Sequence, residues 1–287
     1  MNENQKSALI TGTVSGIGRA TTQRLVSEGW HVFATVMTAA EAEQVSTAFG
    51  DAVTTLIVDV TDAASIARAA SQVDDALDGR RLDGLVNNAG VAMGGPAMEL
   101  PIEEFQQQMD INVTGVLRVT QAFGPLLGTD KARTGDPGRI VMLSSVAGQL
   151  GSPFMAPYVA SKHAVEGLSK CLRIELQHYG IKVIMIEPGM VATPIWEKAG
   201  EVDATPYHNS PLYPAMTRFR DFLTAMGPKG LKPEIIADRI FRALTEPEPR
   251  LAYAVVPDRF NNWTLPKLMP ARMLDRIIAR RAGIVED

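Results

Sequence analysis

Tyr158 and Lys162 are the residues whose types and spacing most directly indicate chemistry. They lie four residues apart in the segment Tyr158-Val159-Ala160-Ser161-Lys162, and this spacing puts two side chains on one face of a helix, one turn apart. Free tyrosine titrates near pH ~10, and a nearby ammonium favours the phenolate and lowers that pKa. We therefore expect a phenol that exchanges protons with an alcohol or a ketone near neutral pH.

Three further polar residues fit the same chemistry. Ser145 lies thirteen residues before Tyr158 and follows Ser144, while Asn112 lies inside a helical pattern. The hydroxyls of Ser145 and Tyr158 can converge on one substrate oxygen, with the lysine charge behind the tyrosine. Taken alone, the serines would mark a polar strand end and Asn112 an ordinary helix residue. The four histidines are scattered, and none has the spacing of a metal ligand: His31, His163, His178 and His208.

A glycine-rich turn precedes these residues. The segment Thr11–Gly18 (TGTVSGIG) follows an apolar run and opens a helical pattern. Glycines at such a turn let the backbone approach a pyrophosphate, and the helix N-terminus adds free amides and a positive dipole. The spacing G-x-x-x-G-x-G differs from the common G-x-G-x-x-G dinucleotide pattern. This spacing also occurs in ordinary turns. The nucleotide-binding interpretation therefore depends on the position of the turn directly after the first predicted strand.

Short apolar runs alternate with helical patterns along the chain. The predicted strands are short, nearly continuously apolar and rich in β-branched residues: Ser7–Thr11, His31–Val36, Thr54–Val58, Gly84–Asn87, Arg139–Leu143, Lys182–Ile186 and Leu251–Val256. Helical patterns cover Ser65–Leu77, Glu103–Phe123 and Tyr158–Tyr179. This order predicts an α/β fold, a single Rossmann-like domain over residues 1–287 with a doubly wound parallel sheet of about seven strands and a C-terminal helical extension.

Composition excludes several classes of protein. The chain has 287 residues, 46% of them hydrophobic, and a formal net charge of -4, which gives no indication of a nucleic-acid partner. Its single cysteine, Cys171, cannot form an internal disulfide and fits a reducing compartment. The first residues lack a signal-peptide pattern, and no apolar run reaches the ~20 residues of a membrane span. We expect a cytoplasmic protein.

The ordered motifs resemble the short-chain dehydrogenase/reductase family, closest in character to its retinol, hydroxysteroid and 3-hydroxybutyrate dehydrogenase members. The resemblance runs from Ser7 to about Thr193. It is carried by the following segments: TGTVSGIG at Thr11–Gly18, Asp59-Val60, NNAG at Asn87–Gly90, Asn112 within NVTG, Ser144-Ser145, YVASK at Tyr158–Lys162 and PGMVAT at Pro188–Thr193.

The resemblance implies an NAD(P)-dependent oxidoreductase that acts on CH–OH groups, and it implies roles for single residues. Tyr158 matches the general acid/base, and Lys162 the residue that holds the nicotinamide ribose and lowers the tyrosine pKa. Ser145, rather than Ser144, matches the serine that binds the substrate oxygen. Asn112 matches the asparagine that holds a proton-relaying water. The implied cofactor-binding positions, besides Tyr158 and Lys162, are Gly12, Val14, Ser15, Gly16, Ile17, Gly18, Met37, Asp59, Val60, Asn88, Ala89, Gly90, Pro188, Gly189, Val191 and Thr193.

The end of the second strand bears on the choice of cofactor. An acidic residue there binds the adenosine ribose and selects NAD, whereas a basic residue there selects NADP. Val36 and Met37 occupy these positions, and Ser15 precedes Gly16 where a basic residue is common in NADP-dependent relatives. Without a cation NADP loses its main contact, so the sequence favours NAD over NADP. Arg19 is expected to face solvent or to form a structural pair.

Substrate information lies mainly after Thr193. Residues 194–250 are expected to hold a substrate-lid insertion, with 257–287 as a C-terminal tail. Aromatic and methionine residues in this insertion either line an apolar lid or pack a small subdomain of their own: Trp196, Tyr207, Tyr213, Met216, Phe219, Phe222 and Met226. Ser145, Gln149, Met155, Tyr158, Met190 and Trp196 are the predicted substrate contacts. We expect a hydrophobic secondary alcohol or ketone, with an aromatic, steroid-like or retinoid-like skeleton among the candidates.

The tail from Pro266 to Ile284 is basic and amphipathic. It fits a membrane-surface helix, but packing on its own domain or on a partner subunit is the favoured interpretation. The resemblance implies a homodimer formed through the helices at Glu103–Phe123 and Tyr158–Tyr179. A non-catalytic NAD(P)-binding sensor or scaffold is the alternative function, and a non-redox epimerase or dehydratase is another.

Overall fold

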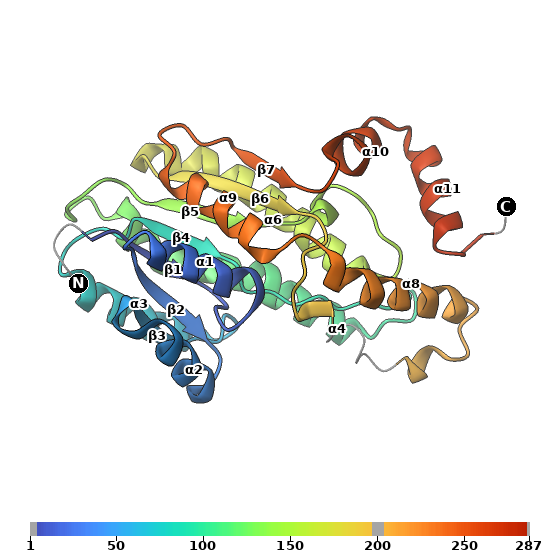
Figure 1. Ribbon diagram of the computed structural model, residues 1–287, viewed down its shortest axis with the longest axis horizontal. Coiled ribbons are helices and arrows are strands. Elements are labelled where there is room, and N and C mark those ends of the chain that lie inside the picture. Colours follow the sequence, from blue (N-terminus) through green and yellow to red (C-terminus); the bar gives the residue numbers. More distant parts are fainter. Residues whose placement is uncertain (1–4, 197–203, 286–287) are drawn as a thin grey trace.

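The fold is built on seven parallel strands. The computed structural model describes residues 5–196 and 204–285, and the strands lie in the order β3-β2-β1-β4-β5-β6-β7 (Figure 1). Their bounds are β1 Ser7–Ile10, β2 His31–Val36, β3 Val53–Ile57, β4 Gly84–Asn87, β5 Arg139–Leu143, β6 Lys182–Pro188 and β7 Ala252–Val255. The predicted doubly wound parallel sheet is therefore confirmed, and the seventh apolar run forms an edge strand paired with β6.

Helices cover both faces of the sheet (Figure 1). Their bounds are α1 Gly16–Ser27, α2 Ala39–Phe49, α3 Ala63–Leu77, α4 Ile102–Met109, α5 Gly115–Gly124, α6 Ala156–Glu175, α8 Tyr213–Met226, α9 Pro233–Thr245, α10 Leu265–Leu268 and α11 Ala271–Arg281. A π-helical segment, Asp110–Thr114, joins α4 to α5. Short 3-10 or π turns lie at Gly50–Ala52, Pro125–Thr129, Val146–Gly148, Leu176–Tyr179, Thr205–Tyr207, Gly227–Lys229 and Phe260–Thr264.

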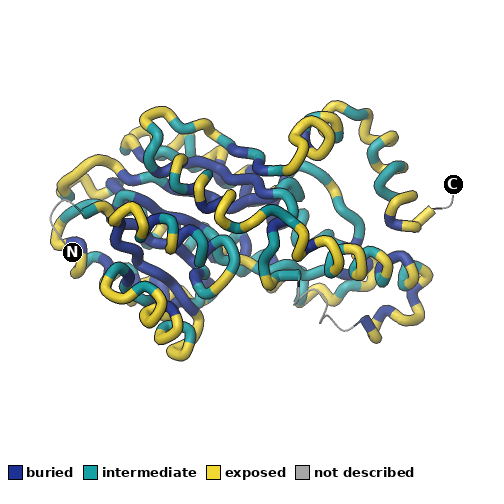
Figure 2. Tube along the Cα trace, viewed as in Figure 1, coloured by how far each residue is buried: buried dark blue, intermediate teal, exposed yellow. Residues whose placement is uncertain are grey.

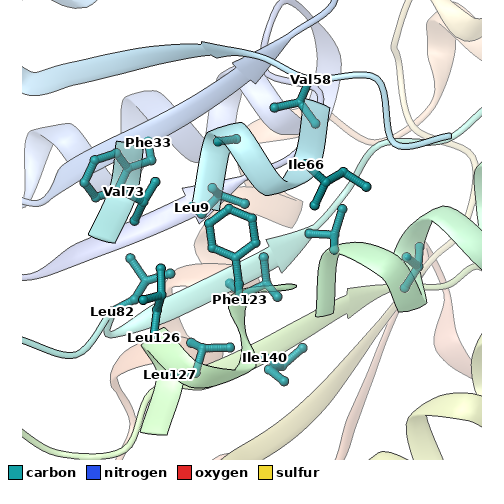
Figure 3. Packing of buried hydrophobic residues seen from close by; sticks show 14 of the residues in the cluster. Leu9, Phe33, Val58, Ile66, Val73, Leu82, Phe123, Leu126, Leu127 and Ile140 are labelled. Atoms are coloured by element: carbon teal, nitrogen blue, oxygen red, sulfur yellow. The ribbon is translucent and has the colours of Figure 1, made fainter. Parts of the chain in front are cut away.

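Each face of the sheet has its own hydrophobic core. On one face, Leu9 and Ile140 from the strands pack with Val73 of α3, Phe123 of α5 and Val165 of α6 (Figure 3). On the other face, strand residues pack against α1, α2 and α9. Strands β1, β2 and β4 are buried along their whole length (Figure 2), which explains why they read as continuous apolar runs.

The range expected for the substrate insertion contains two different parts. Helix α9 packs against α1, and its Ile236, Ile240 and Leu244 lie in the second core. This helix therefore covers the sheet. In contrast, α8 and the turn before it form a small third cluster of their own around Tyr207 and Met216.

The C-terminal helices stand at one end of the molecule (Figure 1). Helix α11 contains no buried residue, and Leu268 and Met273 are 74% and 55% exposed. A hydrogen bond of 3.0 Å from Arg218 Nη2 of α8 to the Gly283 carbonyl ties down the end of this segment. Within residues 5–196 and 204–285, no helix combines the length and the apolar composition needed to cross a membrane.

Candidate active site

The sheet order creates a crevice beside the carboxyl end of β1. Because β1 pairs with β2 on one side and with β4 on the other, the connections leave these strands in opposite directions, and ligands of such sheets bind at this point. The glycine turn follows β1 and the Asn88–Gly90 segment follows β4. Thr11 joins them, since its Oγ1 accepts hydrogen bonds of 2.9 Å from the amides of both Asn88 and Ala89.

The glycine turn is packed too closely for larger residues. A Cβ on Gly18 would lie 2.0 Å from the Gly12 carbonyl oxygen, and Gly12 and Gly16 have φ of +72° and +55°, which favour glycine. Ser15 precedes α1 as an exposed N-cap whose side chain makes no capping hydrogen bond. The residues therefore fit a pyrophosphate, because the backbone can approach it and the first amides of α1 are free to donate.

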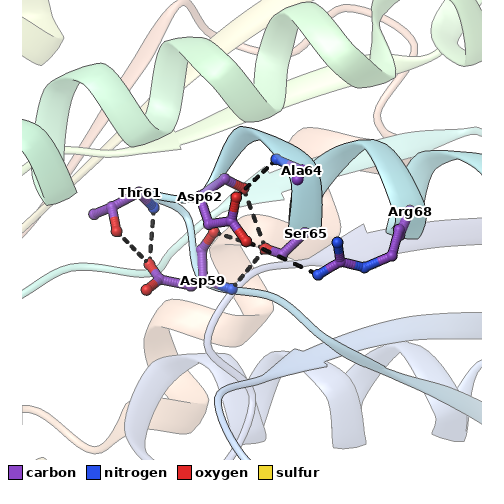
Figure 4. Close-up of polar contacts among 6 residues, drawn as sticks. All are labelled: Asp59, Thr61, Asp62, Ala64, Ser65 and Arg68. Atoms are coloured by element: carbon purple, nitrogen blue, oxygen red, sulfur yellow. Dashed lines mark hydrogen bonds and ion pairs between the residues drawn. The ribbon is translucent and has the colours of Figure 1, made fainter.

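Asp59 lies at the end of β3 and is fixed locally. Its Oδ1 accepts hydrogen bonds of 2.8 and 2.7 Å from the amide and hydroxyl of Thr61, and its own amide donates to Ser65 Oγ at 3.0 Å (Figure 4). Asp62 caps the N-terminus of α3. The neighbouring Val60 side chain instead belongs to the first core, so only its backbone is available to an adenine ring.

The end of β2 carries a carboxylate that the sequence analysis did not single out. The amides of Met37 and Thr38 donate to Glu41 Oε2 at 2.7 and 3.2 Å, as part of a capping box. Arg19, expected to face solvent or to pair, lies 5.4 Å from the centre of the Phe49 ring. Its buried Nη1 has no hydrogen-bond partner among the described residues.

Tyr158, Ser145 and Lys162 meet beside the ends of β5 and β6. The Ser145 hydroxyl hydrogen-bonds the Tyr158 side chain and accepts a 3.1 Å hydrogen bond from the Ala147 amide. Lys162 is buried, and its Nζ donates to the Leu143 carbonyl at 2.7 Å and lies 5.7 Å from the centre of the Tyr158 ring. Two hydroxyls and one buried ammonium thus share a small volume, as the spacing predicts.

The pKa of Tyr158 shifts in the direction opposite to the expected one. Burial raises the pKa of this tyrosine, and the hydrogen bond with Ser145 only partly opposes that rise. The expected lowering of this pKa by Lys162 is therefore not found, because burial disfavours the charged phenolate and is the largest cause of the shift. Burial also lowers the pKa of Lys162 to about 8, against the negative charge of Glu166. Tyr158 is consequently a protonated phenol at neutral pH.

Asn112 is buried in the π-helical segment between α4 and α5. Its amide nitrogen donates to the Val91 carbonyl at 3.0 Å and to Ser161 Oγ at 3.1 Å, and its oxygen accepts from the Val91 amide at 2.9 Å. These bonds join α6 to the segment that follows β4. Single π turns are frequent at functional sites, but the sequence pattern predicted an uninterrupted helix here.

The loop after β6 approaches the glycine turn. A Cβ on Gly16 would lie 3.0 Å from Thr193 Cγ2, so Thr193 is adjacent to the start of α1. The Pro188 carbonyl accepts a hydrogen bond of 3.5 Å from Ser145 Oγ. Val191, by contrast, packs its side chain into the second core. Val14 and Ile17 pack partly against the same core, and Met37 is exposed.

An apolar cavity opens between α8 and the start of α6. Its space, with the solvent-filled mouth included, is about 640 Å³. Its walls are Ala92, Gly94, Gly95, Phe154, Met155, Ile195, Trp196, Ala204, Tyr207, Met216, Phe219, Arg220 and Leu223. Met155 and Trp196 were predicted substrate contacts. Phe222 and Met226, predicted for the same lid, are exposed.

Four of the six predicted substrate contacts are absent from the walls of this cavity: Ser145, Gln149, Tyr158 and Met190. The Gln149 amide is bound between Glu166 and Glu187, so its side chain does not line the cavity. The Met190 carbonyl accepts a 2.9 Å hydrogen bond from the Leu231 amide. Sequence reasoning missed Glu166, Glu187 and Arg220. Only Glu166 carried a local signal, since it follows Lys162 by one helical turn.

Known proteins resemble this chain over nearly its whole length. Residues 6–203 match the family model described as short chain dehydrogenase. An NADPH-dependent 3-dehydrocapnine reductase of Ornithobacterium rhinotracheale is 34% identical over 270 residues, which are 94% of this chain and 95% of that protein. The 17-beta-hydroxysteroid dehydrogenase type 6 of Bos taurus is 34% identical over 286 residues, 96% of this chain and 88% of the relative. A solved short chain dehydrogenase/reductase of Burkholderia phymatum, in complex with NAD, has a TM-score of 0.77 and 25% identity, covering 93% of this chain and 94% of its own.

Proposed function

We propose that this chain, which belongs to the short-chain dehydrogenase/reductase family and is an oxidoreductase that binds NAD(P), interconverts a hydrophobic secondary alcohol and its ketone. The observation that carries the proposal is the position of the buried Lys162 ammonium, 5.7 Å from the centre of the Tyr158 ring, with Ser145 beside the same tyrosine. A sensor that only binds nucleotide has no need of these groups at one point.

The protein's part in the reaction is to place one oxygen and manage one proton. The bound nicotinamide supplies or accepts the hydride. Ser145 and Tyr158 donate hydrogen bonds to the substrate oxygen, and Tyr158 transfers the proton. Because burial raises the pKa of Tyr158, the phenol keeps its proton at neutral pH and suits the reduction of a carbonyl. The Lys162 ammonium stabilises the phenolate that follows.

The cofactor would lie across the crevice between β1 and β4. Gly12, Gly16 and Gly18 border the pyrophosphate, Asp59 the adenine, and Asn88–Gly90 with Thr193 the nicotinamide half. We retain NAD as the preferred cofactor, because the Glu41 carboxylate at the end of β2 would repel a 2′-phosphate. The NADPH dependence of the reductase relative argues for the other choice, and Arg19 with its unpartnered Nη1 would then bind the phosphate.

Titration of nicotinamide fluorescence decides between the cofactors. We expect NADH to bind more tightly than NADPH. Glu41→Gln should reduce this difference in affinity, because it removes the repulsion between the Glu41 carboxylate and the 2′-phosphate of NADPH. Tighter binding of NADPH, weakened by Arg19→Gln, would overturn the proposed preference.

The cavity indicates the substrate class. Apolar side chains such as Phe154, Met216 and Phe219 dominate its walls, and Arg220 is the charged residue among them. Burying one CH₂ group is worth about 0.8 kcal/mol, which is about fourfold in kcat/KM. We therefore expect steroidal and large aromatic alcohols to exceed small aliphatic ones by at least ~100-fold in kcat/KM. The positive charge of Arg220 in the cavity wall is compatible with an acidic group at one end of the substrate.

A substrate panel tests this function directly. Nicotinamide reduction or oxidation is followed with aliphatic, aromatic and steroidal alcohol–ketone pairs, with and without a carboxylate, in the presence of each cofactor. Turnover that rises with apolar size in the wild type and disappears in Tyr158→Phe supports the proposal. Equal turnover of small polar alcohols, or turnover that survives in Tyr158→Phe, would contradict it.

A homodimer is part of the proposal. Ile102 of α4 and Ile174 of α6 are 59% and 67% exposed, and these two helices pack against each other. Exposed apolar residues on adjoining helices support an interface there. The exposed, unpaired Cys171 supports the expected cytoplasmic location, because free thiols persist in reducing compartments.

A further inference from the structure

Two buried carboxyl groups lie behind the Tyr158–Lys162 pair. Glu166 is on α6, one turn after Lys162, and is 2% exposed. Glu187 is on β6, directly before Pro188, and is 4% exposed. Removing two carboxylates from water is costly unless they are hydrogen-bonded or paired, so each of these groups needs a partner that stabilises it.

Gln149 bridges the two carboxyl groups. Its Nε2 donates to Glu166 Oε2 at 3.0 Å and approaches Glu187 Oε1 at 3.5 Å, while its Oε1 accepts from Lys267 Nζ at 3.3 Å. Lys267 belongs to α10, is exposed and lies 4.3 Å from the centre of the Trp263 ring. The C-terminal segment therefore supplies a cation at the outer side of the cluster.

One carboxyl oxygen of the pair, Glu166 Oε1, is buried and has no hydrogen-bond partner among the described residues. A proton on Glu187 supplies the missing donor, since a protonated carboxyl donates one hydrogen bond. Burial and the negative charge of Glu166 raise the pKa of Glu187 to about 7, while Lys267 and Lys170 oppose that rise.

Glu166 follows Lys162 by one turn of α6, and its charge acts on the lysine. The turn after β5 packs directly on α6, because a Cβ on Gly148 would lie 3.0 Å from Glu166 Cγ and 3.2 Å from the Lys162 carbonyl oxygen. The charge of Glu166 raises the pKa of Lys162, although burial lowers that pKa overall to about 8. Loss of the Glu166 charge would therefore release the lysine proton at a lower pH.

We propose that Glu166 and Glu187 form a proton-sharing carboxyl pair that keeps the Lys162 ammonium charged, with Glu166 as the positioning residue next to the lysine. This rests on the proposed role of Lys162 in the reaction. When the pair loses its shared proton, its negative charge increases. The added negative charge then retains the proton on Lys162. The charged groups facing the pair are Lys162 and Lys170 of α6 and Lys267 of α10.

The pH profile of kcat/KM tests the effect on Lys162. In the wild type the rate falls as pH rises past the pKa of Lys162. Glu166→Gln keeps a hydrogen-bond acceptor for Gln149 but removes the negative charge, so the basic limb of the kcat/KM profile shifts to lower pH by at least ~0.5 unit. Glu166→Asp keeps the charge and moves the limb part of the way back to its wild-type position. Glu175→Gln, an exposed change farther along α6, leaves the limb in place. An unchanged limb in folded Glu166→Gln overturns the proposal.

Stability measured without cofactor tests the shared proton separately. The raised pKa of Glu187 means that the folded wild type binds this proton more tightly than the unfolded chain, and loses that advantage as pH rises from 4.5 to about 7. Glu187→Gln lacks this loss, so its stability relative to the wild type increases over the same range. If the difference in unfolding free energy between Glu187→Gln and the wild type does not change with pH, the proposed proton-sharing pair is contradicted. This readout stands even if Tyr158→Phe shows that the proposed reaction is wrong.

Discussion

At the scale of single residues, the structure separates two serines that the sequence leaves adjacent. The Ser145 hydroxyl bonds the Ala147 amide and the Tyr158 side chain. The Ser144 hydroxyl is buried and has no hydrogen-bond partner among the described residues, and it lies against Gly148. Ser145 is therefore the serine that we propose to bind the substrate oxygen, whereas the Ser144 hydroxyl is desolvated without a compensating hydrogen bond.

Substitution of each serine by alanine should give opposite results. Ser145→Ala removes a donor to the developing oxyanion and should lower kcat by ~100-fold. Ser144→Ala should leave kcat within a few-fold and raise the free energy of unfolding by about 1 kcal/mol, because an unsatisfied buried hydroxyl is removed. Steady-state kinetics and denaturant unfolding of both variants measure this. A larger kinetic loss in Ser144→Ala would reverse the assignment.

The direction of a pKa could not be predicted from residue spacing. The four-residue separation correctly places Lys162 beside Tyr158, and it indicates a lowered tyrosine pKa. Burial of the phenol, which raises the pKa, depends on the elements around α6. In the same way, Glu187 and Arg220 come from distant segments, so only the fold brings them to the site.

At the scale of elements, the glycine turn combines backbone conformation with close packing. Gly12 and Gly16 have positive φ, whereas Gly18 is required by its distance to the Gly12 carbonyl oxygen. The sequence predicts this turn because its glycines follow a strand and open a helix. It does not distinguish the conformational glycines from the packing glycine.

Gly18, in the first turn of α1, and Gly167, in the middle of α6, provide a matched test. Gly18→Ala should weaken NADH or NADPH binding at least ~10-fold, since its Cβ must displace the turn that holds the pyrophosphate. Gly167→Ala on α6 meets no atom within 4 Å and should leave binding unchanged while stabilising the fold by about 0.5–1 kcal/mol. Fluorescence titration and thermal unfolding measure both. Wild-type affinity in Gly18→Ala would contradict this account of the turn.

Strands β1, β2 and β4 were predictable because they are buried along their whole length, and strands buried on both faces have continuous apolar sequences. Each of the seven predicted runs overlaps a strand. The π-helical segment at Asp110–Thr114 interrupts what reads as one helix, and its side-chain bonds involve Val91 and Ser161. Such an interruption depends on tertiary partners, so a helical period cannot reveal it.

At the scale of the whole molecule, the molecular mass in solution tests the proposed dimer. A dimer through α4 and α6 has twice the 31.0 kDa mass of the chain. Ile174→Glu should shift it towards monomer, because a charge replaces an apolar contact in the interface. Ile235→Glu, on the exposed side of α9, is the matched control. Light scattering that shows a wild-type monomer at micromolar concentration would refute the dimer.

The most direct test of the central claim is a single-turnover measurement of hydride transfer to a hydrophobic ketone, followed by the loss of reduced nicotinamide absorbance. Wild type and Tyr158→Phe are compared after each has been saturated with cofactor, whose affinity is measured separately. We predict that the cofactor-saturated Tyr158→Phe variant transfers hydride at least ~100-fold more slowly than the wild type, because the proton donor is missing. Hydride transfer at the wild-type rate in this variant would contradict the account.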